Sequence, residues 1–111
     1  MSDNTVFLDQ EVALAVVNII EEAHQQVIFV TPYLGLWRHL RTAIELAVKK
    51  GVDVRFIIRR DREQVRPKDV DWLRSHEVKV FEVEGLHAKI YMNEHTLLVS
   101  SMNITEPSTN N

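Results

Sequence analysis

The unbroken apolar run Val27–Val30 constrains the fold more than any other part of the chain. It is rich in β-branched residues, and such runs are typical of strands that are covered on both faces, as in a parallel sheet. Pro32 ends this strand because proline cannot donate a hydrogen bond to a central ladder. Apolar residues at helical spacing then predict a helix over residues 36–50, which Gly51 ends. An alternating pattern predicts a second strand over residues 52–58. The order strand, helix, strand indicates a parallel pair joined by a right-handed crossover.

The segments on either side extend this pattern. In chain order we predict a short strand at 6–8, a helix at 9–24 with Asp9 as its N-cap, a helix at 69–76, a strand at 78–81 and a hairpin at 86–103. Pro67 is expected to exclude a regular element just before the helix at 69–76. The predicted fold class is α/β, a layered mixed sheet flanked by helices in the order β-α-β-α-β-α-β-β. We expect one domain over residues 1–105 and a polar tail at 106–111, truncated relative to a complete domain.

The composition excludes several classes of protein. The 111 residues include no cysteine, which excludes a disulfide framework, a thiolate metal site and a cysteine nucleophile. The formal net charge of −3 gives no global attraction to nucleic acid, so any site for a polyanion must be a local patch. The N-terminus is polar and acidic, and no apolar run reaches the length of a membrane-spanning helix. We therefore expect a cytoplasmic protein without membrane insertion.

The predicted hairpin carries side chains that suit a phosphate group. Residues alternate between the two faces of a strand, so His87 and Lys89 share a face of the first strand. Ser101 and Asn103 share a face of the second strand. Antiparallel pairing is expected to bring the four together on one surface. There Lys supplies charge, Ser and Asn supply hydrogen bonds, and His can attack phosphorus or carry a proton.

These residues resemble the signature of the phospholipase D superfamily. That signature is His-x-Lys, four residues and an Asp, with Gly-Ser-x-Asn further along the chain. Residues 87–89 read His-Ala-Lys, and residues 100–103 read Ser-Ser-Met-Asn. Glu94 takes the Asp position, or Asn93 does if the hairpin is aligned one residue shorter, and Ser100 replaces the usual Gly. The resemblance covers nearly the whole chain and implies one phospholipase D-like half-domain.

The resemblance also implies a mechanism, that of a metal-independent phosphodiesterase with a phosphohistidine intermediate and no cofactor. The residues that it assigns to catalysis are His87, Lys89, Ser101 and Asn103, with Glu94 and Ser100 in support. A second histidine is needed to protonate the leaving oxygen and then to activate water. In the family this histidine belongs to a second copy of the motif, but the chain has only one copy. The resemblance therefore implies a homodimer with a shared site.

The substrate is less constrained by the sequence. The basic run after the second strand could hold a nucleic-acid backbone, and its leading residues are Arg59, Arg60 and Arg62. The same run is equally consistent with a solvated loop that contains local ion pairs. We expect a nuclease; the alternatives are a non-catalytic DNA- or phosphate-binding module and a phospholipid phosphodiesterase. Trp37 and Trp72 are interpreted as packing or interface residues.

Overall fold

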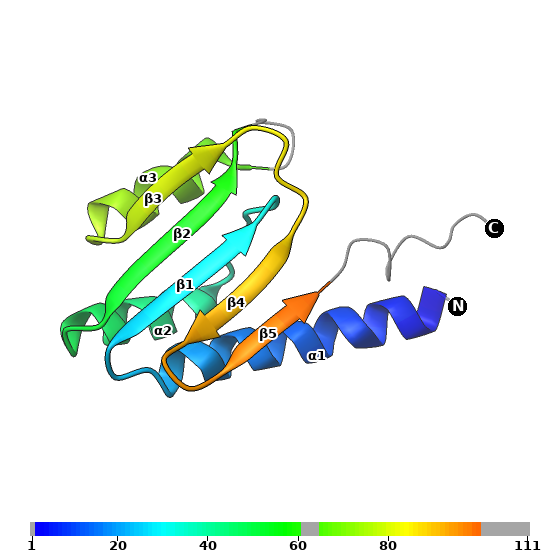
Figure 1. The fold of residues 1–111 in the computed structure, drawn as a ribbon, viewed down its shortest axis with the longest axis horizontal. Helices are drawn as coiled ribbons and strands as arrows, with labels where there is room; N and C mark the ends of the chain where they lie inside the picture. Colours follow the sequence, from blue (N-terminus) through cyan, green and yellow to red (C-terminus); the bar gives the residue numbers. More distant parts are fainter. Residues whose placement is uncertain (1, 61–64, 101–111) are drawn as a thin grey trace.

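The computed structural model describes residues 2–60 and 65–100, and Figure 1 shows how its helices and strands are arranged. In chain order the elements are α1 (Ser2–Glu21), β1 (Gln26–Thr31), α2 (Arg38–Lys49), β2 (Asp53–Arg59), α3 (Pro67–Ser75), β3 (Lys79–Val83), β4 (Lys89–Asn93) and β5 (Leu97–Ser100). The fold is α/β, with a five-stranded mixed sheet flanked by helices, as the sequence predicted.

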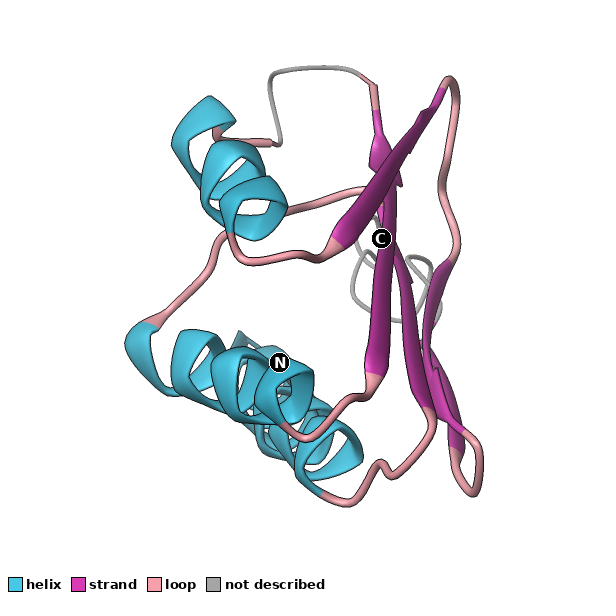
Figure 2. Cartoon of the chain, turned by 90° about the vertical axis from the view of Figure 1, so that its left-hand side faces the viewer, coloured by secondary structure: helices cyan, strands magenta, loops and turns pink. Residues whose placement is uncertain are grey.

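The sheet has the strand order β3-β2-β1-β4-β5. Strands β1, β2 and β3 are parallel, whereas β4 runs antiparallel to β1 and β5 antiparallel to β4. The crossovers through α2 and α3 step in the same direction along the sheet, and right-handed crossovers of this kind put both helices on one face. Helix α1 packs against α2 and β4. The structure describes three helices, and Figure 2 shows them on the same face of the sheet, which we call the inner face.

The core lies between these helices and the inner face. Phe29 of β1 is at its centre, with its ring 5.2 Å from that of Phe56 on β2 and 5.0 Å from that of Tyr91 on β4. Leu40 and Ile44 of α2 are also buried in this core. Truncation of one such ring to alanine typically costs about 3–5 kcal/mol. The same packing therefore fixes the position of β4 relative to β1.

The outer face of the sheet carries a row of apolar side chains. The strand registers align Phe81, Ile57, Val30, Ile90 and Val99 side by side across all five strands. The two at the sheet edges, Phe81 and Val99, are 49% and 62% exposed. The prediction that β1 is covered on both faces is met on the inner face alone, because the three described helices all lie there.

Two predictions about the helices were wrong. Helix α1 begins at Ser2, so residues 6–8 are helical and Asp9 is not its N-cap. No glycine or proline interrupts residues 2–21, and a packed helix propagates through such a segment. Pro67 does not exclude a regular element but is the first residue of α3. The N–H that proline lacks has no partner at that position of a helix in any case.

The predicted start of the hairpin was also wrong, because β4 begins at Lys89 rather than at residue 86. Strand β3 lies at one edge of the sheet and β4 on the far side of β1, so the connection must cross the ends of β2 and β1 (Figure 1). This crossing spans about 14 Å, three strand spacings, and it uses residues 84–88. His87 therefore lies in a loop instead of a strand.

Candidate active site

Lys89 lies at the topological switch point of the sheet, where the chain connections leave β1 in opposite directions. Val30 pairs with Ile90, so Lys89 at the start of β4 lies beside the carboxyl end of β1. From β1 the chain steps to β2 on one side, and it later returns to β4 on the other side. Open α/β sheets bind their ligands at the carboxyl ends of strands at such a switch point. His87 is exposed in the loop that leads into this edge.

The Lys89 side chain is half-buried, and its ammonium lies 4.9 Å from the centroid of the Tyr33 ring. Such a cation–π contact orients the ammonium without neutralising it. Opposite Lys89, the register places Ser100 at the end of β5. Lys89 and Ser100 therefore share the inner face, whereas Val99 points to the outer face with Ile90. Ser101 and Asn103 lie outside the described residues, so the predicted grouping of all four side chains stays a prediction.

A cavity of about 220 Å³ adjoins Lys89 on the inner face. Tyr33, Leu34 and Trp37, from the segment between β1 and α2, form one part of its lining. Gly35 of the same segment also lines it, and the remaining lining residues belong to the sheet and to helices α1 and α2. The exposed fraction of Trp37 is 42%, so its side chain packs only in part, and the predicted packing or interface role stays a prediction.

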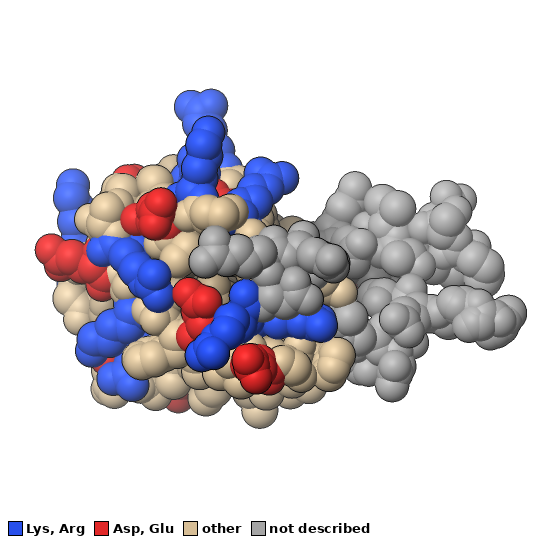
Figure 3. Space-filling view, turned by 90° about the horizontal axis from the view of Figure 1, so that it is seen from above, with Lys and Arg blue, Asp and Glu red and all other residues tan. Residues whose placement is uncertain are grey.

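The basic side chains predicted to bind substrate lie at the same end of the sheet as Lys89, where the parallel strands have their carboxyl ends. Arg59 ends β2, and together with Arg60 and Arg74 it lines a second cavity of about 120 Å³. Arg60 also pairs with Glu84 at 3.7 Å, and both side chains are exposed, so this ion pair contributes little to stability. Figure 3 shows lysine and arginine side chains spread over this edge with acidic ones among them. Arg62 lies outside the described residues.

Asn93 stabilises the turn between β4 and β5, at the end of the sheet opposite Lys89. The Asn93 amide donates to the carbonyl oxygen of Ile19 at 2.8 Å. Its side-chain oxygen accepts from the backbone N–H groups of His95 and Thr96 at 2.7 and 2.8 Å. Asn93 is only 4% exposed, so these contacts are shielded from water. The bond to Ile19 fastens the hairpin to the end of α1, and the other two hold the turn in shape.

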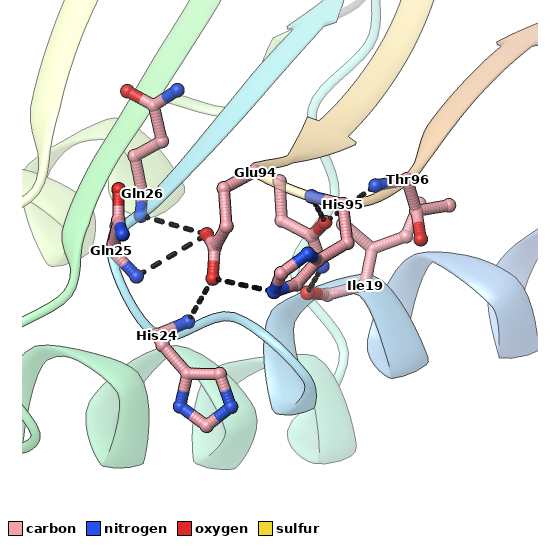
Figure 4. Close-up of polar contacts among 8 residues, drawn as sticks. Ile19, His24, Gln25, Gln26, Glu94, His95 and Thr96 are labelled. Atoms are coloured by element: carbon pink, nitrogen blue, oxygen red, sulfur yellow. Dashed lines mark hydrogen bonds and ion pairs between the residues drawn. The ribbon is translucent and has the colours of Figure 1, made fainter.

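Glu94 makes a second connection at this turn. Its carboxylate accepts from the N–H of His24 at 2.6 Å and from those of Gln25 and Gln26 at 3.2 Å each (Figure 4). Loss of hydration tends to raise the pKa of this carboxyl, but the backbone N–H donors outweigh it and lower the pKa to about 2. Lys89 lies at the other end of β4. Glu94 thus holds the start of β1 and the hairpin turn together, at a distance from the candidate site.

Sequence reasoning overlooked Asp69, which positions the segment that lines the 220 Å³ cavity. Its buried carboxylate accepts from the N–H of Leu36 at 3.1 Å and from the guanidinium of Arg41 at 3.0 Å. Asp69 follows Pro67 by two residues, and in the sequence it looks like an ordinary acidic residue in the first turn of a helix. The contact with Leu36 spans 33 positions, and no local pattern indicates it.

Two features are absent from residues 2–60 and 65–100, the part of the chain that the structure describes. No group of three or more His, Asp or Glu side chains there is arranged to hold a metal ion. No helix there is long and apolar enough to cross a membrane.

The mixed sheet, with His87 and Lys89 at its switch point, defines an α/β domain of the phospholipase D type. A family model described as "Cardiolipin synthase, PLD-like domain" matches residues 16–111. The chain therefore belongs to the PLD-like domain family, whose membership indicates phosphodiesterase activity in general. No curated protein matches the sequence.

Solved structures support the same fold. A phospholipase D family member, Nuc from Salmonella typhimurium, is similar with a TM-score of 0.62 at 17% identity, over 89% of this chain and 69% of that one. TrmBL2, an archaeal chromatin protein described with a novel mode of DNA binding, gives 0.55 at 13% identity over 76% of this chain and 33% of that one. Polyphosphate kinase from Porphyromonas gingivalis gives 0.55 at 15% identity over 78% of this chain and 14% of that one. At these identities the likeness establishes the fold alone.

Proposed function

We propose that this chain is a metal-independent nuclease that cleaves phosphodiester bonds through a phosphohistidine at His87. The observation that carries the proposal is the position of Lys89, beside an exposed histidine loop and an adjoining cavity at the switch point of the sheet. A positive charge fixed where a ligand binds stabilises the charge that develops on the non-bridging phosphate oxygens. Ser101 and Asn103 would add hydrogen bonds to the same oxygens.

The proposed reaction consists of two displacements. A ring nitrogen of His87 attacks phosphorus, the P–O bond to the leaving group breaks, and a second imidazole protonates the leaving oxygen. That imidazole then takes a proton from water, and the water oxygen displaces His87 from phosphorus. The second imidazole would be the partner's His87 in a two-fold dimer.

Nucleic acid is the proposed substrate because of the arginines at the same edge. Arg59, Arg60 and Arg74 line one cavity, and a guanidinium group can bind two phosphate oxygens at once. Asp71 and Glu82 line it as well, and Arg74 pairs with Glu82 at 3.5 Å, so a phosphate would have to compete with these carboxylates for the arginines. With a net charge of −3 overall, a polyanion needs a local site such as this one. The second candidate, a binding module without catalysis, is favoured by the fold likeness to a chromatin protein described as binding DNA.

The test is cleavage of a labelled DNA oligonucleotide in the presence of EDTA. We expect wild type to cleave it, and His87→Ala to be slower by at least about a hundredfold, because in the dimer the variant removes the nucleophile and also the acid–base imidazole, whose loss alone costs about that factor. Lys89→Ala should lose a similar factor through weaker charge stabilisation. His95→Ala is the matched control, because its imidazole is exposed at the opposite edge of the sheet.

Five results would contradict the proposal, each in a different part. Equal cleavage by wild type and His87→Ala would exclude the phosphohistidine route, and loss of cleavage in EDTA would exclude metal independence. DNA binding without cleavage by wild type would support the binding module, whereas cleavage of a phospholipid but not DNA would change the substrate class. A monomer with full activity would exclude the shared site.

A further inference from the structure

The cavity beside Lys89 has a lining suited to a planar ring. Tyr33 and Trp37 contribute aromatic side chains to it, and Leu34 and Phe29 contribute apolar surface. Aromatic side chains are the usual platforms for unpaired nucleobases, since every base has a π-face that can stack on them. At about 220 Å³ the space is compact, and most of a long acyl chain would remain outside it.

The Lys89 ammonium, which is the group proposed to bind phosphate, lies directly beside the cavity. The Lys89 ammonium lies 4.9 Å from the Tyr33 ring centroid, and both residues line the cavity. A phosphate held by this ammonium would therefore have its own nucleoside at the cavity mouth. The arginine cavity is separate, since it lies at the ends of β2 and β3 against α3.

The lining segment is already fixed in place without a ligand. The Thr31 hydroxyl accepts from the N–H of Tyr33 at 3.2 Å, and Asp69 accepts from the N–H of Leu36 at 3.1 Å. Between them Leu34 forms a parallel bridge with Val65. A preformed site of this kind binds its ligand without a large ordering cost.

From these observations we propose that the cavity is a nucleobase subsite, which takes the base adjacent to the phosphate held by Lys89. The inference rests on the proposed function in one respect, the phosphate at Lys89, and it adds Tyr33 and Trp37 as residues that bind the base. It predicts that unpaired nucleic acid is preferred, because a base inside a duplex cannot reach the cavity.

The test measures binding rather than cleavage, so its failure can be distinguished from that of the nuclease proposal. In a His87→Ala background, calorimetric titration compares thymidine 5′-monophosphate with deoxyribose 5-phosphate, which lacks the base. We expect the nucleotide to bind about 5- to 150-fold more tightly, the range that one stacked base contributes. Trp37→Ala should reduce this preference by a similar factor.

Two further variants separate a lost contact from a damaged fold. Gly35 lines the cavity, and a Cβ atom added there meets no heavy atom within 4 Å, so the backbone accepts a side chain and we expect Gly35→Leu to occupy part of the cavity without disturbing the core. It should remove the preference for the nucleotide as Trp37→Ala does. Phe81→Ala, which removes an exposed aromatic ring from the outer face, is the matched control and should leave the preference unchanged.

Equal affinity for the two phosphates, no measurable binding of either, or a preference that survives both cavity variants would each overturn the inference. A short-chain phosphatidylglycerol that binds in a Trp37-dependent manner while the nucleotide does not would overturn it as well, in favour of a lipid. Cleavage of DNA could still occur in any of these cases, so the nuclease proposal would be judged separately.

Discussion

Replacement of Asn93 should test how strongly the hairpin is fastened to helix α1. Asn93→Ala removes three hydrogen bonds of 2.7–2.8 Å from a side chain that is 4% exposed. At about 0.5–1.5 kcal/mol for each, the free energy of unfolding should fall by roughly 2–4 kcal/mol. Urea denaturation at pH 7, followed by tryptophan fluorescence, measures it. Thr96→Ala is the control, because Thr96 takes part through its backbone N–H, and it should stay within about 0.5 kcal/mol of wild type.

The stability of an Asn93→Asp variant at different pH values tests the same hydrogen bonds. The variant keeps the acceptor for His95 and Thr96 but turns a carboxylate oxygen toward the carbonyl of Ile19, so at pH 7 it should be at least as unstable as Asn93→Ala. A protonated carboxyl can donate to that carbonyl, so folding should raise the pKa of this aspartate. Its penalty relative to wild type should shrink as the pH falls below the raised pKa, and should be smallest below the unfolded value of about 3.9. An Asn93→Ala variant as stable as wild type, or an Asn93→Asp penalty independent of pH, would refute the reasoning.

Two further predictions concern the carboxylates. Asp69→Ala should lower the free energy of unfolding by about 2–3 kcal/mol, because it leaves the Leu36 N–H and the Arg41 guanidinium without their acceptor. Asp71 is exposed on the same helix, so Asp71→Ala should change the free energy of unfolding little. Similar urea midpoints for the two variants would contradict this prediction. Since folding lowers the pKa of Glu94 from 4.5 to about 2, the stability that its ionised form contributes is complete above pH 4.5 and is lost as the pH falls toward 2. Glu94→Gln should therefore flatten the loss of thermal stability over that range, and a curve parallel to that of wild type would count against the assigned contacts.

The local parts of the fold were predictable from the sequence. The apolar run of β1, the helix ended by Gly51 and the alternating β2 each depend on neighbouring residues, and the structure confirms all three within a few residues. His87 and Lys89 stand out because of their residue types and spacing alone. The alternating pattern of side chains predicted that the strand of His87 and Lys89 starts too early in the chain. Such a pattern does not show how many residues are needed to cross from β3 to β4.

The contacts that fix the hairpin and the cavity relative to the rest of the fold were not predictable, because they join residues far apart in the chain. Glu94 meets His24 across 70 positions and Asn93 meets Ile19 across 74. Tyr33 approaches Lys89 only because β4 inserts beside β1, and sequence alone does not specify strand order. The cavity between them follows from that strand order and from the place where α1 packs.

The separation of Asn93 and Glu94 from their partners has a consequence for the order of folding. The units β1-α2-β2 and β2-α3-β3 can form from contacts between neighbouring parts of the chain, but β4 must close a far longer loop to reach β1. Closing it costs chain entropy before any contact is gained, so hairpin docking belongs to the late part of the reaction. Lys89 is carried by that hairpin. During refolding, the phosphate binding proposed for Lys89 should therefore return after most of the helical signal, as one of the last properties to be recovered.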